Sequence, residues 1–510
     1  MHRMAGTPTG MENSAGPGPG ELRGRLRLPA RLFAGAVVCA LLFPHSNQAQ
    51  EPITGVEVFT AEDFQERRNA IARTIGSGAL ALVPGASADH SSTRFRQSNQ
   101  FFYLTGLETP NSYLVIEGGS GQSTLYLPAP NSSRDQTDGP TLSLVDPQAV
   151  MDRTGAAAAR PLDQMAEDLG RRSPPGTPVY VPFFPGEGHA QSRAGILRAE
   201  VDRFSDPWDG RLGREANFVH LLRSRFPFLE IRNLSPILDE LRLRKSEKEV
   251  AVIRRATQLG GEALMEAMRS TAPGVKEKEL DALAQFLFVR HGAQGEAFRA
   301  IVASGPNAWF AHHRASPRAM LEGEMVLMDY CPDLAYYRCD VTRMWPVSGR
   351  FSQEQQELYG FYLAFYEAIL YAIRPGISPQ QVKIDALVEI DRILEDWAFS
   401  QPHFERAARG FVESYRRGAD DPETRLGHHV GLSTHDPGGA GAGLLEPGMV
   451  FVIEPQFRVP EDNVYIRIED IIVITEDGAE ILSDFVPRSI EGIEALMQEE
   501  GILQQVPRVP

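Results

Sequence analysis

Cysteine is scarce in this chain of 510 residues, which contains only Cys39, Cys331 and Cys339. Neither Cys331 nor Cys339 stands beside a histidine that would activate a thiol, so the sequence argues against cysteine catalysis. The two residues flank a short turn region. Strand alternation counted from Asp329 and Asp340 places them on opposite faces unless a bulge intervenes, and a disulfide needs Cβ atoms that point toward each other. We therefore expect two free thiols.

Positive charge is also in short supply, because the chain has a formal net charge of −16 at pH 7. This balance argues against nucleic acid and anionic membrane as partners. The first 50 residues carry five basic and two acidic side chains, so the remainder has a net charge of −19. A composition of 42% hydrophobic and 23% charged residues is ordinary for a soluble globular protein.

The hydrophobic run near the N-terminus is too short to span a bilayer. Leu32–Phe43 is twelve residues long, whereas a transmembrane helix needs about 20. Arginines precede the run within Arg23–Arg31, and the polar Ser46–Gln50 follows it, which is the pattern of a secretory signal peptide. We expect export to the periplasm or the medium, with no stable membrane insertion after cleavage. An uncleaved anchor is the alternative, and the long preamble suggests a true start at Met4 or Met11.

The chain is long enough for two or three domains. Helix-capping sequences at Thr60–Asp63 and Ser246–Glu249 begin two predicted helices. Tyr113–Glu117 and Ser123–Leu127 are predicted to form a hairpin. We divide the chain into a leader with signal peptide at 1–50, an N-terminal domain at 51–235, a catalytic domain at 236–500 and a tail at 501–510.

Two aspartates lie around a predicted turn in the catalytic domain. The apolar run Met325–Met328 ends on Asp329. Pro332-Asp333 is predicted to turn the chain, and Tyr336–Val341 to return as a strand that carries Asp340. An isolated charge beside an apolar run is costly unless it is paired or bound to a metal. Taken alone, however, the pattern fits a hairpin with two solvated aspartates equally well.

Three further polar residues occur at corresponding places downstream. His428 lies between Gly427 and Gly431, Glu454 ends the predicted strand Val450–Ile453, and Glu469 follows the predicted strand Val464–Ile468. Four carboxylates and one imidazole would satisfy two divalent cations, and such a pair can activate a water for hydrolysis. The hard oxygen ligands favour Mn²⁺, with Co²⁺, Zn²⁺ and Fe²⁺ as alternatives, and the absence of thiolates argues against structural zinc.

These residues carry a resemblance to a known family. Asp329, Asp340, His428, Glu454 and Glu469 match, in order and local context, the five metal ligands of the pita-bread metallopeptidases of family M24. This family includes methionine aminopeptidase, prolidase and aminopeptidase P. The stretches Val302–His313, Cys339–Arg343 and Ile466–Gly478 resemble the aminopeptidase P branch, and the resemblance covers nearly all of the chain after residue 58. It implies an α+β fold, with a pita-bread C-terminal catalytic domain preceded by a smaller α/β N-terminal domain (creatinase/prolidase-like).

The resemblance also implies an activity and residue roles. A metal-dependent aminopeptidase of this type releases the N-terminal residue of a peptide, preferentially with proline in second position, through a hydroxide that bridges two metals. Glu454 would be the general base, His312 would contact the substrate near the scissile bond, and His435 would stabilise the gem-diolate. His313 and His429 are the adjacent alternatives for these histidines. The family further suggests a homodimer or homotetramer.

Three further residues concern the surroundings of the predicted metal ligands: Arg467, and two positions at which the chain departs from the family pattern. Arg467 precedes Glu469 by two residues, so on a strand it faces the same side and can pair with a ligand carboxylate. Thr424 stands where the family usually has histidine, and Arg458 stands where it often has tyrosine. Both positions lie near the substrate pocket in the family, so the two departures put strict proline preference in doubt. A dipeptide-cleaving prolidase is the alternative activity. A non-catalytic binding protein is a further alternative, although such relatives, like metal-independent amidinohydrolases, generally lose metal ligands.

Overall fold

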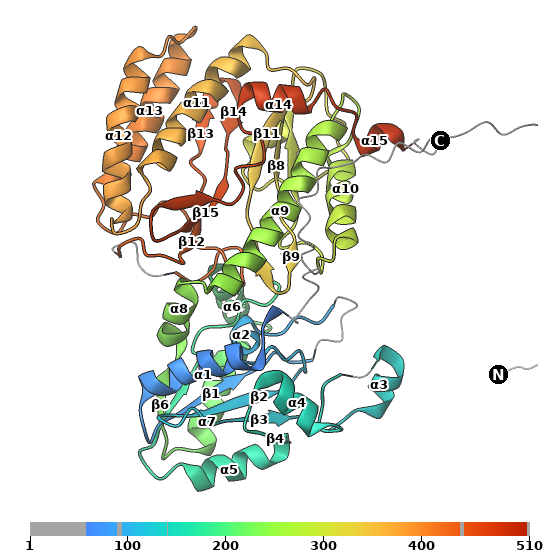
Figure 1. Cartoon of the computed structure of the whole chain (residues 1–510), viewed down its shortest axis with the longest axis vertical. Coiled ribbons are helices and arrows are strands. Elements are labelled where there is room, and N and C mark those ends of the chain that lie inside the picture. Colours follow the sequence, from blue (N-terminus) through green and yellow to red (C-terminus); the bar gives the residue numbers. More distant parts are fainter. Residues whose placement is uncertain (1–57, 89–93, 140, 439–442, 507–510) are drawn as a thin grey trace, which may run out of the picture. The chain divides into compact units, whose positions relative to one another are not determined.

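The computed structural model describes residues 58–88, 94–139, 141–438 and 443–506 (Figure 1). The predicted signal peptide, Cys39 and the last four residues of the predicted tail lie outside this range. Within the described residues, no helix combines the length and the apolar character that a membrane span requires.

A six-stranded mixed sheet forms the centre of the N-terminal part, in the order β4-β3-β2-β1-β5-β6. β1 pairs antiparallel with β2 and parallel with β5. The β2–β3 hairpin has the predicted bounds, with Tyr113 opposite Tyr126. The strands are β1 (Leu80–Pro84), β2 (Tyr113–Glu117), β3 (Ser123–Leu127), β4 (Ala158–Pro161), β5 (Pro178–Val181) and β6 (Glu230–Asn233).

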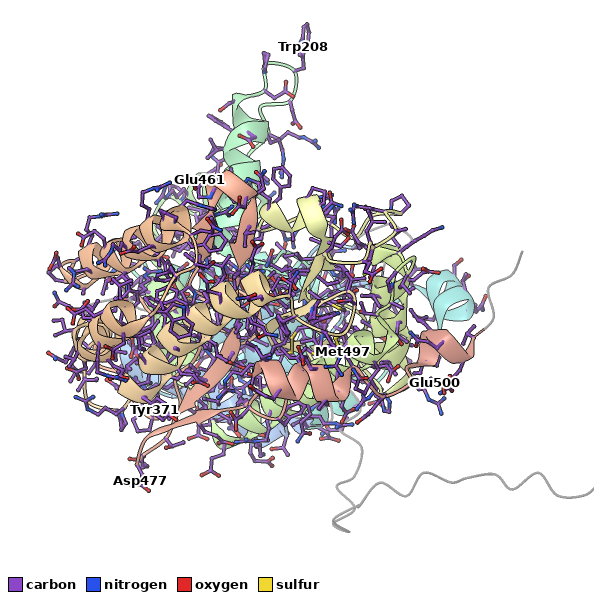
Figure 2. The ribbon with its side chains drawn as sticks, turned by 90° about the horizontal axis from the view of Figure 1, so that it is seen from above. Trp208, Tyr371, Glu461, Asp477, Met497 and Glu500 are labelled. Carbon is purple, nitrogen blue, oxygen red and sulfur yellow. A yellow bond between two sulfur atoms is a disulfide. The ribbon has the colours of Figure 1, made fainter. Side chains whose placement is uncertain are left out.

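Helices surround this sheet. At the start of α1 the backbone N–H of Thr60 donates to Asp63 Oδ2 at 2.7 Å, as its capping sequence predicts. Trp208 follows α6 and stands at the tip of a projection, with 95% of its surface exposed (Figure 2). The helices are α1 (Ala61–Ile75), α2 (Asn99–Thr105), α3 (Ser132–Asp138), α4 (Pro147–Thr154), α5 (Met165–Arg172), α6 (Arg193–Ser205), α7 (Arg214–Arg225) and α8 (Ser235–Leu243), with the 3₁₀ helix η2 (Leu162–Gln164).

The C-terminal part contains two three-stranded sheets, β11-β8-β7 and β12-β15-β16. A backbone bridge between Thr342 and Glu469 joins them, so the two strand groups meet at this point. The strands are β7 (Ile301–Ser304), β8 (Met325–Asp329), β9 (Asp333–Leu334), β10 (Tyr337–Arg338), β11 (Thr342–Pro346), β12 (Val450–Ile453), β13 (Phe457–Val459), β14 (Val464–Ile466), β15 (Asp470–Ile474) and β16 (Ala479–Ile481).

Helices back these sheets, and their caps follow the sequence. At α9 the backbone N–H of Ser246 donates to Glu249 Oε2 at 3.0 Å. From α11 the hydroxyl of Tyr362 donates to Pro455 O and accepts from Ile468 N, both at 2.8 Å, which holds the segments beside two predicted ligands. The helices are α9 (Glu247–Ser270), α10 (Glu277–Arg290), α11 (Gln353–Ala372), α12 (Pro379–Asp396), α13 (Pro402–Ala419), α14 (Ile490–Leu496) and α15 (Ile502–Gln505), with the 3₁₀ helices η3 (Gly305–Trp309) and η4 (Pro460–Asp462).

The predicted turn between the two aspartates is displaced along the chain. Asp333 lies in β9, and the reversal occurs at Ala335 and Tyr336, whose φ angles are 50° and 72°. Two consecutive positive φ values are the geometry of a tight two-residue hairpin turn. The carboxylate of Asp333 forms a buried ion pair with Arg96 of the N-terminal part, and this long-range contact holds Asp333 inside the strand.

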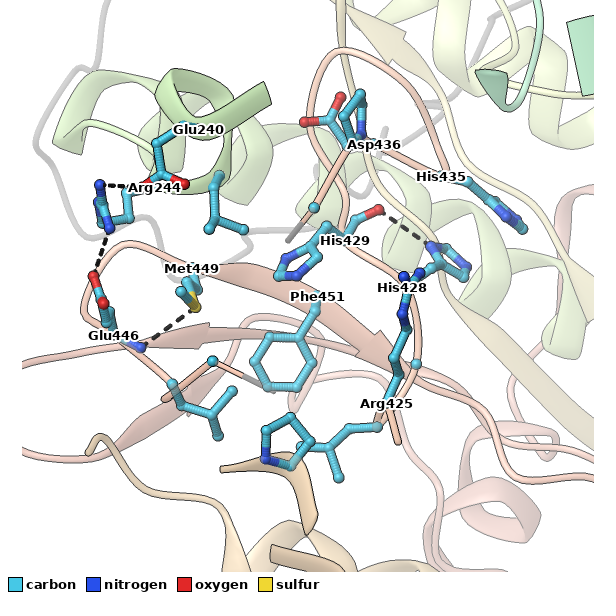
Figure 3. A pocket seen from close by; sticks show the side chains of 18 of the residues that line it. Glu240, Arg244, Arg425, His428, His429, His435, Asp436, Glu446, Met449 and Phe451 are labelled. Carbon is cyan, nitrogen blue, oxygen red and sulfur yellow. Dashed lines mark hydrogen bonds and ion pairs between the residues drawn. The ribbon is translucent and has the colours of Figure 1, made fainter. Parts of the chain in front are cut away.

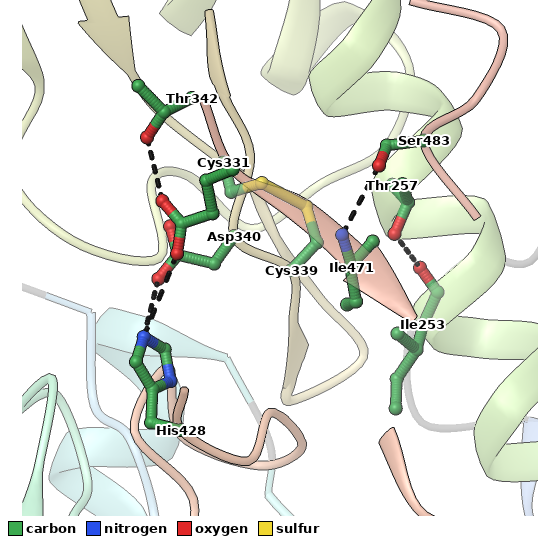
Figure 4. Close-up of a disulfide and its surroundings, with 10 residues drawn as sticks. Ile253, Thr257, Cys331, Cys339, Asp340, Thr342, His428, Ile471 and Ser483 are labelled. Atoms are coloured by element: carbon green, nitrogen blue, oxygen red, sulfur yellow. Dashed lines mark hydrogen bonds and ion pairs between the residues drawn. A yellow bond between two sulfur atoms is a disulfide. The ribbon is translucent and has the colours of Figure 1, made fainter. Parts of the chain in front are cut away.

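Cys331 and Cys339 form a disulfide, so the expectation of two free thiols is wrong (Figure 4). Their Cα atoms are 5.6 Å apart. The expectation assumed unbroken strand alternation from one aspartate to the other. In the structure, residues 330–332 and 339–341 lie between the short strands and belong to none of them. Alternation therefore does not carry across these segments, and both sulfurs reach the same side.

Candidate metal centre

The five side chains predicted as metal ligands meet where the two sheets join. Asp329 ends β8, Asp340 follows β10, Glu454 follows β12, Glu469 precedes β15, and His428 comes from the loop before β12. His428 Nε2 lies 3.5 Å from Asp340 Oδ2 (Figure 4). It also lies 3.7 Å from Glu454 Oε1 and 3.8 Å from Glu469 Oε1. Ligand atoms of Asp329, Asp340 and Glu469 also lie within 4.8 Å of one another. Chain segments more than 100 residues apart thus supply one cluster.

Several oxygens of this cluster are buried without a protein partner. Within the described residues, Asp329 Oδ1, Asp340 Oδ1 and Glu469 Oε1 accept no hydrogen bond. Burial, and then the neighbouring carboxylates, raise the pKa values of Asp340 and Glu469 well above their usual range. Burial also lowers the pKa of His428 to about 4, so its ring is neutral at pH 7 and can offer a lone pair. Buried, mutually repelling carboxylates with a neutral imidazole fit divalent cations.

Neighbouring side chains hold the opposite oxygens of these carboxylates. Thr342 Oγ1 donates to Glu469 Oε2 at 2.7 Å. Arg467 donates to Asp329 Oδ2 at 2.5 Å and to Glu454 Oε2 at 3.1 Å. The free oxygens of Asp329 and Glu469 are consequently left for the centre. Sequence reasoning anticipated the pairing of Arg467 but missed Thr342, although Thr342 lies two residues after Asp340 and shares its strand parity.

His435 lies against His428, with their ring centroids 3.8 Å apart and the rings nearly parallel. The backbone N–H of His435 donates to Gln191 O at 2.9 Å, so the N-terminal part positions this residue. Burial lowers the pKa of His435 to about 4, which keeps its ring neutral at pH 7. His429, the adjacent alternative, lies beside Phe451 (Figure 3) and its Nδ1 is 3.3 Å from Val450 O.

His312 and His313 point to different surroundings. His313 Nε2 lies 3.8 Å from Glu277 Oε2, a buried carboxylate that also accepts from the backbone and hydroxyl of Ser304. His312 instead lines a cavity of about 350 Å³ next to β7. Of the two neighbours, His312 is therefore the one that faces open space.

A second cavity, of about 520 Å³, opens beside the imidazoles of His428 and His435 (Figure 3). Arg425 and Phe451 are among the residues that line it. The volume accommodates the side chains of a short peptide, since ligand pockets are of this order.

The two departures from the family pattern have partners within the protein. Thr424 Oγ1 accepts from Lys383 Nζ at 2.6 Å. Arg458 donates to Trp309 O at 2.9 Å, and its guanidinium lies 4.3 Å above the ring of Tyr465. Arg458 thereby supports the loop that leads to His312.

Two family models match the chain. The model of metallopeptidase family M24 matches residues 251–476. The model of the aminopeptidase P N-terminal domain matches residues 64–178. All five clustered side chains lie inside the first match.

Individual relatives agree with these matches. The Xaa-Pro aminopeptidase of Escherichia coli is 31% identical over 463 residues, which cover 86% of this chain and 97% of that protein. Xaa-Pro aminopeptidase 3 of Mus musculus is 28% identical over 79% of this chain and 76% of its own length. Among solved structures, E. coli aminopeptidase P with the inhibitor Pro-Leu has a TM-score of 0.68 at 28% identity, covering 86% of this chain and 98% of that one. Proline aminopeptidase P II from Yersinia pestis has a TM-score of 0.69 at 27% identity, covering 86% and 100%.

Proposed function

Because the chain belongs to metallopeptidase family M24 and carries an aminopeptidase P N-terminal domain, we propose that it is a metal-dependent aminopeptidase. It releases the N-terminal residue from peptides, preferentially those with proline in second position. Relatives that are named Xaa-Pro aminopeptidases, and that match over nearly their full length, favour this activity over dipeptide cleavage by a prolidase.

One observation carries the proposal above the others. Three buried carboxylate oxygens, on Asp329, Asp340 and Glu469, have no protein partner among the described residues and converge with His428. Two divalent cations held there would polarise the scissile carbonyl and lower the pKa of a water. Repulsion between these buried carboxylates lowers the stability of the protein when no cation is present. A family member that did not bind metal would gain nothing from keeping them together.

Protein groups around the centre supply the remaining chemistry. Glu454 Oε2 is held by Arg467, while Oε1 faces His428, so Glu454 can take a proton from the attacking water. Burial raises the pKa of Glu454 above its ordinary value, which makes it a better proton acceptor. His435 is neutral and can donate an N–H to the carbonyl oxygen as that oxygen gains charge. His312 faces the same region from the opposite strand group and orients the substrate backbone.

Purified protein, assayed with Mn²⁺ on Xaa-Pro-Xaa tripeptides and Xaa-Pro dipeptides, tests the activity. We expect turnover of the tripeptide and much weaker turnover of the dipeptide. Asp340→Asn should abolish both, because Asp340 contributes to two of the ligand groups. Tripeptide cleavage that persists in Asp340→Asn, or after exhaustive chelation, would refute the metal-dependent function. A second-position series, with alanine replacing proline, measures how strict the proline preference is in a chain with Thr424 and Arg458.

We also propose Mn²⁺ as the metal, a homodimer or homotetramer as the assembly, and export as the destination. The oxygen-rich ligand set supports Mn²⁺, with Co²⁺, Zn²⁺ and Fe²⁺ as competitors. Export is supported by the basic and apolar N-terminal sequence, and independently by the Cys331–Cys339 disulfide, because disulfides persist in oxidising compartments. Metal analysis, analytical ultracentrifugation and N-terminal sequencing of exported protein test the three statements separately.

A further inference from the structure

The cavity beside His312 is lined by basic groups and by no acidic ones. Its volume is about 350 Å³. Among the described residues that border it are two arginines, Arg299 and Arg314, and two histidines, His189 and His312, but no carboxylate. Such a basic cavity is unexpected in a chain with a net charge of −16, and a concave basic site attracts anionic groups.

Sheet register places Arg314 close to the metal centre. Arg314 forms a backbone bridge with Ile301, and Ile301 is paired with Asp329. Neighbouring strands are about 4.8 Å apart, so the backbone of Arg314 lies roughly 10 Å from that of Asp329, two strand spacings away. Residues directly opposite one another in antiparallel strands project to the same face, so Arg314 projects to the face on which Asp329 meets the other ligands.

Neither arginine has a protein partner among the described residues. Arg299 and Arg314 are both exposed, and their side chains form no hydrogen bond or ion pair with the described residues. Two arginines that line the larger cavity are instead paired, Arg193 with Asp239 and Arg244 with Glu446. The two cavity arginines are thus available to a ligand.

We propose that Arg299 and Arg314 bind a carboxylate of the substrate on the leaving-group side of the scissile bond. The inference deepens the proposed peptidase function and rests on it. An extended chain advances about 3.5 Å per residue, so the C-terminal carboxylate of a tripeptide lies about 7 Å beyond the scissile carbonyl. An extended arginine side chain from the backbone of Arg314 bridges the remaining distance. The preferred substrates are consequently short peptides with a free C-terminus, or longer peptides with an acidic third residue.

Three substrates separate these sources of the carboxylate: Ala-Pro-Ala, its C-terminal amide, and Ala-Pro-Asp amide. For the native chain we expect kcat/KM to be about tenfold higher for the free acid than for its amide, the size of one charge-assisted hydrogen bond. A similar preference for Ala-Pro-Asp amide would show that an acidic third side chain also binds. The double variant Arg299→Gln/Arg314→Gln should lose these preferences, with hydrolysis of Ala-Pro-Ala amide unchanged within about twofold.

Arg290→Gln is the matched control, because Arg290 is an exposed arginine at the end of α10 that does not line the cavity. It should retain the full preference for the free acid. Binding of the product Pro-Ala and of Pro-Ala amide, measured by calorimetry, gives a readout without turnover. Equal hydrolysis and equal binding of acid and amide by the native chain would overturn the inference while leaving the peptidase function intact. If the native chain hydrolysed none of the substrates but still bound Pro-Ala more tightly than Pro-Ala amide, the peptidase function alone would be refuted.

Discussion

The guanidinium of Arg467 donates to Asp329 Oδ2 at 2.5 Å, although Asp329 ends β8 in one sheet and Arg467 precedes β15 in the other. The same group reaches Glu454 Oε2 at 3.1 Å. Only 1% of the Arg467 side chain is exposed. One buried cation therefore orients two predicted metal ligands and leaves their other oxygens directed at the centre.

Replacing Arg467 by lysine should weaken metal binding. A lysine ammonium is a point charge that cannot span two carboxylates with fixed geometry, and loss of such supporting contacts costs about 10–100-fold in metal affinity. Isothermal titration of metal-free protein with Mn²⁺ measures the effect. Arg254→Lys, which alters only the surface ion pair with Glu480, should leave the affinity unchanged. Equal affinities for the two variants would contradict the role given to Arg467.

The Cys331–Cys339 disulfide should contribute measurably to stability. The bridge closes a loop between residues eight positions apart, for which chain entropy predicts about 2–3 kcal/mol. Both the reduced protein and the double variant Cys331→Ala/Cys339→Ala should unfold at a lower urea concentration than the oxidised protein. Agreement between the two would assign the loss to the cross-link, whereas a loss in the variant alone would assign it to packing. Because Asp340 directly follows Cys339, we also expect weaker Mn²⁺ binding in both forms.

Metal binding should release protons and strengthen as pH rises. The pKa values of Asp340 and Glu469 are raised by burial and by neighbouring carboxylates, so the metal-free centre retains protons that a cation must displace. Apparent affinity should therefore fall as pH is lowered from about 8 to about 6. Calorimetry in two buffers of different ionisation enthalpy counts the released protons. A pH-independent affinity with no proton release would show that the carboxylates are already ionised without metal.

Local sequence signals specified much of the fold. The β2–β3 hairpin matches its predicted bounds because polar, glycine-rich residues separate two apolar runs, and the capping sequences at Thr60 and Ser246 begin α1 and α9. The positions of clustered carboxylates were also readable, because apolar strands end on Asp329 and Glu454. In these segments the chain's own periodicity agrees with its tertiary surroundings.

Long-range contacts decided what sequence reasoning missed. The position of the β9–β10 turn depends on Asp333 pairing with Arg96, which lies 237 residues earlier. The disulfide depends on breaks in the strands that no local pattern marks. The position of Arg314 beside Ile301 could not be predicted from the sequence, because their bridge is an isolated contact outside any strand. Interactions between distant segments leave no periodic trace in the sequence.

Glu215 should destabilise the protein at neutral pH. Burial raises its pKa to about 7, so the folded state holds a proton more tightly than the unfolded state. The protonated carboxyl group of Glu215 stabilises the folded state fully at pH values below its unfolded pKa of about 4.5. This stabilisation is lost as the pH rises through about 7. Glu215→Gln should therefore gain roughly 2 kcal/mol in urea unfolding at about pH 8, and little below about pH 4.5. Glu66→Gln, the same change on the exposed surface of α1, should stay within about 0.5 kcal/mol.

Adjacent histidines should separate catalysis from stability. His312 lines the cavity beside the metal centre, whereas His313 Nε2 lies 3.8 Å from the buried carboxylate of Glu277. His312→Ala should lower kcat/KM by about 10²-fold, the size of the effect when a substrate is no longer held in position, with an unchanged urea midpoint. His313→Ala should instead lower the free energy of unfolding by about 1–2 kcal/mol, because it removes a neighbour of a buried charge. Its kcat should change by less than about threefold. The opposite pattern would mean that His313, and not His312, reaches the substrate, since only one of two consecutive residues can face the centre.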